Sequence, residues 1–180
     1  MAGMQEGVRM VSKGDAAFLV EIYRPFVEET VISFEYDVPS VEEMEERIVR
    51  VREGGYPWLV GEMEGQVVGY AYASQFNERT AYQWAVNVTV YVDSACHGTG
   101  LAQKLYASLF AILSERGFVQ AYALIVVPNL KSENFHKRFG FTPVGLLPSI
   151  GFKFGQWHSV QWWLKSLCDL PQTPKSLTSE

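Results

Sequence analysis

Cysteine is scarce in this 180-residue chain, which contains only Cys96 and Cys168. The two stand far apart and form no Cys-x-x-Cys pair, so the sequence indicates neither a disulfide framework nor a cysteine zinc site. Cys96 and His97 are adjacent, but no third or fourth ligand has matching spacing. We therefore expect no metal, and a protein suited to a reducing, cytoplasmic environment.

Positive charge and long hydrophobic runs are also lacking. Lys and Arg total 15 against 20 Asp and Glu, a net charge of -5, and no local basic stripe interrupts this balance. Nucleic-acid binding proteins normally carry such a stripe, so we expect no nucleic-acid partner. No window reaches the length of a membrane span, and "MAGMQEGVRMVSKGD" has no apolar core of signal-peptide length. We expect no membrane partner.

Apolar residues make up 48% of the chain and aromatic residues 14%, which is enough for one compact α/β domain. We find no internal repeat and no interdomain linker, and we expect a single domain over residues 1–168. The remaining segment, "DLPQTPKSLTSE" at 169–180, is polar and has two prolines. It is predicted to be a mobile tail.

Hydrophobic periodicity, capping residues and glycines give the order β-α-α-β-β-β-α-β-α-β, typical of an α/β domain with a mixed sheet. Ser12 with Asp15 and Ser40 with Glu43 are helix-capping signals, and Glu64-Gly65 predicts a hairpin turn. Strands are predicted at 7–12, 56–63, 66–75, 82–92, 119–127 and 157–167, and helices at 16–29, 41–53, 100–116 and 130–140.

The segment "VTVYVDSACHGTGLAQKLY" joins the strand ending at Val92 to a helix through a loop of small residues. Gly98 and Gly100 let a backbone approach a bulky ligand with several N–H groups aligned, and the helix adds the positive end of its dipole. The segment lacks the third glycine of a dinucleotide fingerprint and the Gly-Lys-Ser/Thr of a P-loop. Alone it indicates either a phosphate-binding loop or a flexible turn.

A second motif follows downstream. Asn129 stands at the tip of a buried strand, and Ser132 and His136 share one face of the next helix. The patterns His97-x-x-Gly100-x-Ala102 and Asn129-x-x-Ser132-x-x-x-His136-x-x-x-Gly140-Phe141 together resemble the Gcn5-related N-acetyltransferase (GNAT) family. The stretches "YPWLVGEMEGQVVGYAYA", "RTAYQW", "TVYV" and "GFKFGQWHSVQWW" resemble its phosphinothricin acetyltransferase branch.

This resemblance implies the GNAT acyl-CoA N-acyltransferase fold, a mixed central sheet with splayed parallel strands flanked by helices. It implies acetyl-CoA as the co-substrate, bound between the splayed strands. Backbone groups near Val90 and Val92 would pair with the pantetheine amides, the amides of 98–103 would hold the pyrophosphate, and Asn129 would bond the pantetheine arm. The cofactor-binding residues implied are Val90, Tyr91, Val92, His97, Gly98, Thr99, Gly100, Leu101, Ala102, Gln103, Asn129, Ser132 and His136.

The resemblance assigns the catalytic positions to Asn87 and His136. His136 falls where many relatives place a tyrosine that protonates the leaving thiolate, a role open to histidine; a plain contact with CoA or solvent is the alternative. Asn87 stands where the branch has a glutamate that accepts the amine proton. An amide cannot be a general base. A water chain, Glu35 or an acceptor that arrives neutral remain open as replacements.

Four residues are implied for the acceptor pocket: Phe34, Arg79, Tyr82 and Trp84. The guanidinium of Arg79 suits a carboxylate, although a solvated loop arginine is the alternative, as simple packing is for the aromatic residues. Ser159 replaces an aspartate of the branch. Together with the departures at Asn87 and His97, this change makes phosphinothricin itself a poor candidate substrate.

Two further departures lie in the pyrophosphate loop. His97 replaces Gln or Arg, so we expect CoA binding to strengthen modestly below about pH 6.5. Cys96 lies near a helix N-terminus, which allows either a lowered pKa or an inert thiol.

The sequence thus predicts an acetyl-CoA-dependent N-acetyltransferase acting on a small amine, an amino acid or an analogue of the phosphinothricin or methionine sulfoximine kind. Analogy with relatives implies a homodimer. The alternatives are a GNAT enzyme for another amine class and an acyl-CoA-binding protein with impaired catalysis.

Overall fold

The computed structural model describes residues 6–178; residues 1–5, the start of the N-terminal segment discussed above, and residues 179–180 of the predicted tail lie outside the described part. Within residues 6–178 one seven-stranded sheet is flanked by four α-helices. The strands are β1 (Glu6–Met10), β2 (Trp58–Met63), β3 (Gln66–Gln75), β4 (Ala85–Val92), β5 (Gln120–Val127), β6 (Thr142–Lys153) and β7 (Gln156–Ser166). The helices are α1 (Ala16–Glu28), α2 (Val41–Glu53), α3 (Leu101–Glu115) and α4 (Leu130–Arg138).

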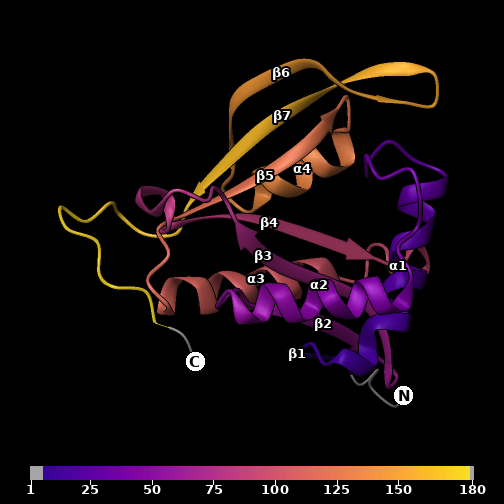
Figure 1. Cartoon of the computed structure of the whole chain (residues 1–180), viewed down its shortest axis with the longest axis horizontal. Helices are drawn as coiled ribbons and strands as arrows, with labels where there is room; N and C mark the ends of the chain where they lie inside the picture. The colour runs from indigo at the N-terminus through magenta and orange to yellow at the C-terminus, as the bar shows by residue number, and fades with distance from the viewer. Residues whose placement is uncertain (1–5, 179–180) are drawn as a thin grey trace.

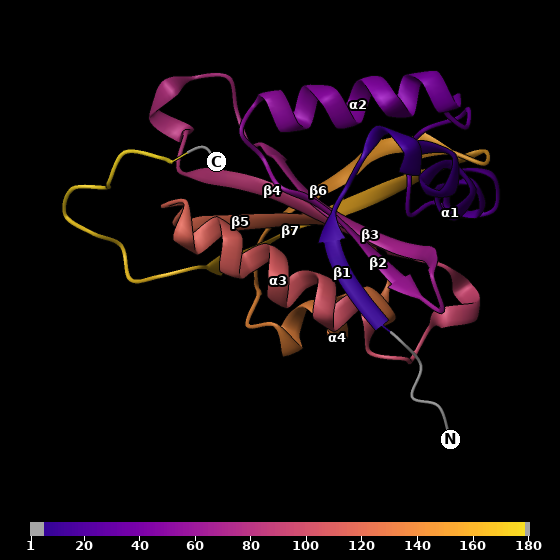
Figure 2. The same ribbon diagram turned by 90° about the horizontal axis from the view of Figure 1, so that it is seen from below.

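The strand order is β1-β2-β3-β4-β5-β7-β6, and every neighbouring pair is antiparallel except β4 and β5. Helices α1 and α2 cover one face of the sheet, and α3 and α4 cover the other (Figure 2). The predicted α/β fold with a mixed sheet is confirmed.

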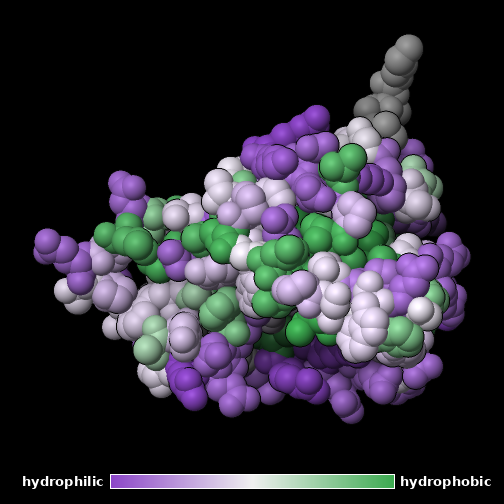
Figure 3. Space-filling model, turned by 90° about the horizontal axis from the view of Figure 1, so that it is seen from above, coloured by the Kyte–Doolittle hydropathy of each residue, from purple (hydrophilic) through white to green (hydrophobic). Residues whose placement is uncertain are grey.

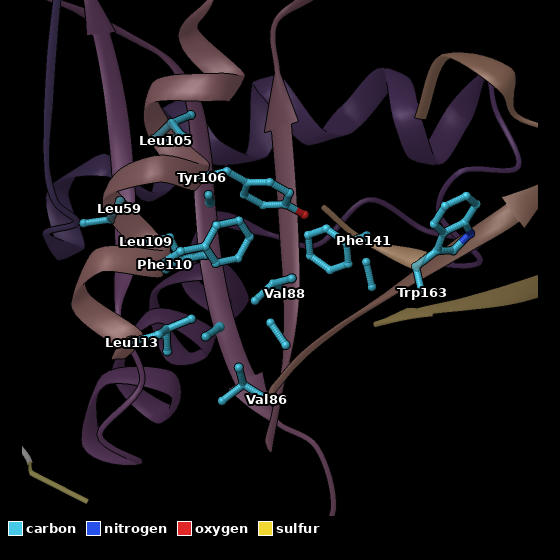
Figure 4. Close-up of a cluster of buried hydrophobic side chains, with 14 of the residues drawn as sticks. Leu59, Val86, Val88, Leu105, Tyr106, Leu109, Phe110, Leu113, Phe141 and Trp163 are labelled. Carbon is cyan, nitrogen blue, oxygen red and sulfur yellow. The ribbon is translucent and has the colours of Figure 1, made fainter. Parts of the chain in front are cut away.

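Alternating side chains on the strands create one core on each face. On β2, Trp58 and Val60 pack beneath α1 and α2, whereas Leu59 points to the opposite core, under α3. In that second core, leucines and aromatic residues of α3 lie against Val86 and Val88 of β4 (Figure 4). Helix α3 is therefore fixed against β4, and its N-terminus lies where β4 ends.

The capping signals read from the sequence are present at α2 and before α1. Ser40 Oγ accepts from Glu43 N at 3.1 Å, and the Glu43 carboxylate accepts from Ser40 N at 2.8 Å. Before α1, the buried Asp15 carboxylate accepts from Ser12 N at 2.7 Å and pairs with Arg9 through two bonds of 2.8 Å. These bonds lower the pKa of Asp15 to about 2 against the desolvation that raises it.

Strands β4 and β5 diverge along their length. Their parallel pairing covers only Ala85 to Asn87 against Gln120 to Tyr122. Beyond Asn87 and Tyr122 the two strands separate (Figure 1), while β5 continues to pair with β7 as far as Val127. The expected splay of two central parallel strands is therefore present, and it begins at Asn87.

The structure corrects the prediction in two places. The segment 142–153, for which no strand was predicted, forms the edge strand β6, which pairs with β7 through two register shifts. Its prolines and glycines, among them Pro143 and Gly151, obscure the alternation that marks a strand, and an edge strand with bulges tolerates them. Strand β4 begins at Ala85 rather than at 82, because Thr80–Tyr82 forms a short 3-10 turn.

Part of the C-terminal segment contacts the domain. Trp84 Nε1 donates to Lys175 O at 2.7 Å, Thr178 N donates to Arg116 O at 3.1 Å, and Leu177 packs against the core beneath α3. The mobility of residues 169–180 stays a prediction. No helix of the described chain is long and apolar enough to cross a membrane.

Candidate active site

A cleft of about 560 Å³ opens where β4 and β5 separate. Its walls come from the second half of β4, the loop before α3, the first turn of α3, and α4. Phe26 of α1 and Ile32, in the segment after α1, also line it, and Phe26 packs on Tyr91 of β4 with ring centroids 4.8 Å apart. The geometry of the sheet therefore places a ligand-sized space at the carboxyl ends of its two parallel strands.

The edge of β4 that faces the cleft has backbone groups that no strand of the described chain binds, although Val92 O accepts from the His97 side chain at 3.1 Å. Asp93, which follows β4, donates its N–H to Val68 O of β3. Because successive residues of a strand turn their N–H and C=O to opposite edges, those of Val90 and Val92 turn toward β5. No strand of the described chain pairs with them there, since β5 has already diverged. These groups can bind the amides of an extended ligand.

The loop before α3 presents a set of backbone amides to the same cleft. Gly98 has φ +84° and Gly100 has φ +92°, a left-handed conformation that favours glycine. Gly100 is the N-cap of α3, so the amides of 101–103 begin the helix with no acceptor inside it. Thr99 turns its hydroxyl to Cys96 O, at 2.8 Å. With the helix dipole, this arrangement suits a diphosphate.

His97 connects this loop to α4 through Lys131, a residue that the sequence analysis missed. The ammonium of Lys131 donates to His97 Nδ1 at 2.8 Å, which leaves Nε2 to donate to Val92 O at 3.1 Å. Lys131 therefore places a positive charge at the cleft, beside the loop before α3. The expected strengthening of CoA binding at low pH stays a prediction.

His136 lies 6% exposed in the wall of the cleft. Its Nδ1 donates to Ser132 O at 2.8 Å, so Nε2 accepts from Tyr106 Oη at 3.1 Å. Burial lowers the pKa of His136, because the charged ring would lose its hydration. Tyr106, also missed from the sequence, is buried, and desolvation raises the pKa of its hydroxyl. In this state His136 is neutral, and Nε2, the nitrogen that would deliver a proton, accepts the hydrogen bond from Tyr106 instead.

The lowered pKa of His136 predicts an acid-sensitive fold. The unfolded chain takes up a proton on this ring near pH 6.5, whereas the folded chain resists it, so the free energy of unfolding falls as pH drops below about 6.5. The contribution of this one group approaches about 1.4 kcal/mol per pH unit. Urea unfolding between pH 7.5 and 5 should show a smaller pH slope in His136→Asn than in the wild type. Equal slopes would contradict the assignment.

Asn87 stands at the point where β4 and β5 part, and it faces the cleft. Its Nδ2 donates to Gln75 O at 3.1 Å, which fixes the orientation of the amide. Its Oδ1 is buried, and no donor in the described chain reaches it. A buried acceptor without a partner is costly, so this oxygen is suited to receive an N–H from a ligand.

Glu35, the alternative base considered from the sequence, is engaged elsewhere. Arg47 binds both of its carboxylate oxygens, at 2.7 and 3.0 Å, and Tyr23 donates to one of them at 3.1 Å. Glu35 does not line the cleft. The geometry therefore gives it a structural task in the segment between α1 and α2.

Comparisons with known proteins agree with this geometry. A family model described as an acetyltransferase (GNAT) domain matches residues 8–162. This chain belongs to the GNAT acetyltransferase family. It is an N-acetyltransferase related to phosphinothricin and methionine sulfoximine acetyltransferases.

The acetyltransferase is 34% identical over 168 residues to a phosphinothricin N-acetyltransferase of Streptomyces viridochromogenes, covering 93% of this chain and 91% of that protein. It is 31% identical over 150 residues to an L-methionine sulfoximine/L-methionine sulfone acetyltransferase of Salmonella typhimurium, covering 83% and 88%. A crystal structure of a GNAT superfamily phosphinothricin acetyltransferase from Sinorhizobium meliloti in complex with acetyl-CoA matches with a TM-score of 0.90 and 33% identity, covering 96% and 94%.

The acetyltransferase cleft gathers nearly all of the predicted cofactor residues, from β4, the loop, α3 and α4; Thr99 alone among them does not line it. The predicted catalytic pair, Asn87 and His136, lines it too. Cys96 also lies in its wall, but burial and the nearby Asp93 raise the pKa of this thiol. The suggestion of a lowered pKa at Cys96 is therefore wrong, because desolvation outweighs the helix terminus.

The four residues predicted for the acceptor do not line the cleft of the described chain. Arg79 is the exposed N-cap of the 3-10 turn before β4, and Tyr82 packs on Phe76 with ring centroids 5.7 Å apart. Trp84 binds the C-terminal segment, as described above. Phe34 packs on Gly151 of β6. Their roles as acceptor contacts stay predictions.

Tyr106 and Lys131 carried only weak sequence signals. Tyr106 sits among the apolar residues of α3 and reads as core, which it also is (Figure 4). Lys131 looks like one of several basic residues on a solvated helix. Residues 6–178 contain no group of three or more His, Cys, Asp or Glu side chains placed to hold a metal ion.

Proposed function

We propose that this enzyme transfers the acetyl group of acetyl-CoA to the amine of a small molecule, an amino acid or an analogue of the phosphinothricin or methionine sulfoximine kind. The observation that carries the proposal is the cleft itself: a free β4 edge, a glycine-capped helix N-terminus and the unpartnered Asn87 Oδ1 line one continuous space. The activities named for the two curated relatives support the substrate class.

Acetyl-CoA fits the residues present. The amides from Gly98 to Gln103 and the ammonium of Lys131 suit the pyrophosphate, and the backbone of Val90 and Val92 suits the pantetheine amides. Asn129 caps α4 by accepting from Ser132 N at 3.1 Å, which places its side chain at the wall between the strands and α4. Bound there, acetyl-CoA supplies an activated thioester at the end of the cleft near Asn87.

The reaction is a direct transfer. The amine, with an N–H donated to Asn87 Oδ1, attacks the thioester carbonyl; the C–N bond forms, the C–S bond breaks, and CoA leaves as a thiolate. Backbone N–H groups of the β4 edge stabilise the negative charge on the carbonyl oxygen. The ammonium loses one proton to solvent before attack, since Asn87 cannot take it and Glu35 is paired with Arg47. The nitrogen loses a second proton to solvent once the C–N bond has formed, which leaves the neutral amide. Positioning of the two substrates provides most of the rate.

Protonation of the leaving thiolate is assigned to the hydrogen-bonded pair Tyr106 and His136, both of which line the cleft. Because Nε2 accepts in this state, a proton entering the pair must reach Tyr106 or Nε2 from solvent. This assignment gives His136 its sequence-predicted place in catalysis and adds Tyr106 to it.

A homodimer is part of the proposal. Six large apolar side chains of the β6–β7 hairpin are exposed: Val144, Leu146, Ile150, Phe152, Phe154 and Trp157. Figure 3 shows apolar residues gathered on one face of the molecule. Apolar patches of this kind are typical of protein interfaces, and the hairpin contacts the segment after α1, which contributes Ile32 to the cleft. A second copy seated on this face would add residues to the acceptor site.

The decisive experiment is a panel of amino acids and analogues, including phosphinothricin, methionine sulfoximine and methionine sulfone, assayed for CoA release in the presence of acetyl-CoA. We expect turnover of at least one of them. Polyamines, aromatic amines and peptide N-termini form the comparison set, and turnover of these alone would move the assignment to another amine class. Acetyl-CoA binding without turnover of any compound would favour the acyl-CoA-binding alternative.

A further inference from the structure

Lys153, the last residue of β6, carries a buried charge that the acetyl transfer does not use. The side chain is 2% exposed. Its ammonium donates to three backbone carbonyls, Val27 O at 2.6 Å, Ser33 O at 2.8 Å and Thr30 O at 2.9 Å. An ammonium has three protons, so all of its donors are satisfied by the end of α1 and the segment that follows it.

Burial of the Lys153 ammonium opposes folding. Burying an ammonium costs free energy that neutral carbonyls offset only in part, and burial accordingly lowers the pKa of Lys153. The carbonyls at 27, 30 and 33 converge on one point only when the chain between them holds a single conformation. The bonds of Lys153 therefore specify the path of residues 27–33 more than they stabilise the fold.

Other contacts attach the same segment to the β6–β7 hairpin. The ring of Phe34 lies so close to Gly151 that a Cβ at that position would overlap it. The hydroxyl of Tyr36 donates to Phe152 O. Figure 1 shows the chain after α1 lying beside the tip of the hairpin, far from it in sequence. Lys153 is the buried centre of this attachment.

The opposite side of the segment is fixed to the helices. Tyr23 of α1 bonds Ser33 Oγ at 2.6 Å, and Arg47 of α2 holds Glu35 through the two bonds described above. Ile32, between the carbonyls of Thr30 and Ser33, is the residue of this stretch that lines the cleft, whose lining also includes Asn87. The position of Ile32 therefore depends on what holds its two neighbours.

We propose that Lys153 is a positioning residue for the acceptor: by binding the carbonyls of Val27, Thr30 and Ser33, its ammonium holds Ile32 as a wall of the acceptor end of the cleft. The proposal rests on the proposed function, since it assigns that end to the amine. It also couples the apolar hairpin to substrate binding, because Lys153 joins β6 to the segment after α1.

The test is Lys153→Met, which keeps a long apolar side chain and removes the charge and the three donors. We expect the KM for the best amine of the panel to rise about tenfold or more, with the Kd for acetyl-CoA within about twofold of the wild type. Lys165→Met is the matched control. Lys165, on β7, also donates to a backbone carbonyl, Phe139 O at 2.8 Å, but away from the segment 27–36. Its loss should leave the KM for the amine unchanged.

Two further measurements keep the test decisive if Lys153→Met folds poorly. Tyr36→Phe removes the exposed hydrogen bond to Phe152 O, and we expect a smaller rise in the KM for the amine.

Hydrogen exchange of the amides at 29–36 should accelerate in Lys153→Met and Tyr36→Phe and not in Lys165→Met. Hydrogen exchange needs no substrate, so it tests whether Lys153 holds the segment 27–33 even if the wild type acetylates no amine. A wild type without turnover would count only against the proposed function. Unchanged exchange and an unchanged KM in Lys153→Met would overturn the inference, as would an equal loss of acetyl-CoA affinity.

Discussion

Acetyl-CoA affinity should fall at least about 100-fold when Gly100 is replaced by valine, a loss of about 2.7 kcal/mol of binding free energy. Gly100 has φ +92° at the N-cap of α3, a conformation that a β-branched residue adopts only with strain. Gly100 lines the cleft, and a Cβ built on it meets no atom within 4 Å, so it would point into open space. The side chain would therefore occupy ligand space. Titration calorimetry with acetyl-CoA measures the effect.

The matched control for this change is Gly65→Val. Gly65 lies in the turn between β2 and β3 with φ +78°, and a Cβ there also meets nothing within 4 Å. It does not line the cleft. Both variants therefore carry the same kind of backbone strain, and both should lose some stability in urea unfolding. Only Gly100→Val should lose acetyl-CoA affinity; an affinity equal to that of the control would refute the assignment of this loop to the cofactor.

The cofactor side of the site was predictable because its signals are local. The glycines at 98 and 100, the helix that follows them and the pair Asn129 and Ser132 each act through neighbouring backbone, so their spacing in sequence nearly fixes their geometry. Strands β2, β3 and β5 were predictable for a similar reason, since alternation or a short apolar run is visible in a single window. The splay of β4 from β5 needed the family resemblance, and the structure then located it at Asn87.

The acceptor side was not predictable in the same way. Ile32 reaches the cleft because Lys153, more than a hundred residues later, binds the carbonyls on either side of it. Strand β6, which carries Lys153, was itself missed, because its pairing with β7 rather than its own pattern makes it a strand. Phe34 packs against Gly151, more than a hundred residues away in sequence, and its contact with the acceptor stays a prediction. Contacts between segments far apart in sequence set these positions. A short stretch of the sequence, read by itself, gives no sign of such contacts.

The second large effect concerns the missing base. With the best acceptor of the panel, log kcat/KM of the wild type should rise with a slope of about 1 per pH unit until the pH reaches the pKa of the acceptor amine itself. Only the neutral amine attacks, and neither Asn87 nor the paired Glu35 removes its proton. In Asn87→Glu a carboxylate at the same place takes that proton. We expect kcat/KM near pH 6.5 to increase about tenfold or more, and the slope to flatten, as general bases typically contribute at least about 100-fold.

Asn87→Gln separates this chemistry from the change of shape. Glutamine has the length of glutamate and no basicity, so it should keep the unit slope and show no gain in rate. Both variants also disturb the bond from Asn87 Nδ2 to Gln75 O, which makes the comparison between them, rather than with the wild type, the measure of the base. A wild-type profile that levels off well below the amine pKa would mean that another group accepts the proton. Equal profiles for the Glu and Gln variants would place the attacking amine away from Asn87, and the acceptor end of the cleft would then have to be sought elsewhere along β4.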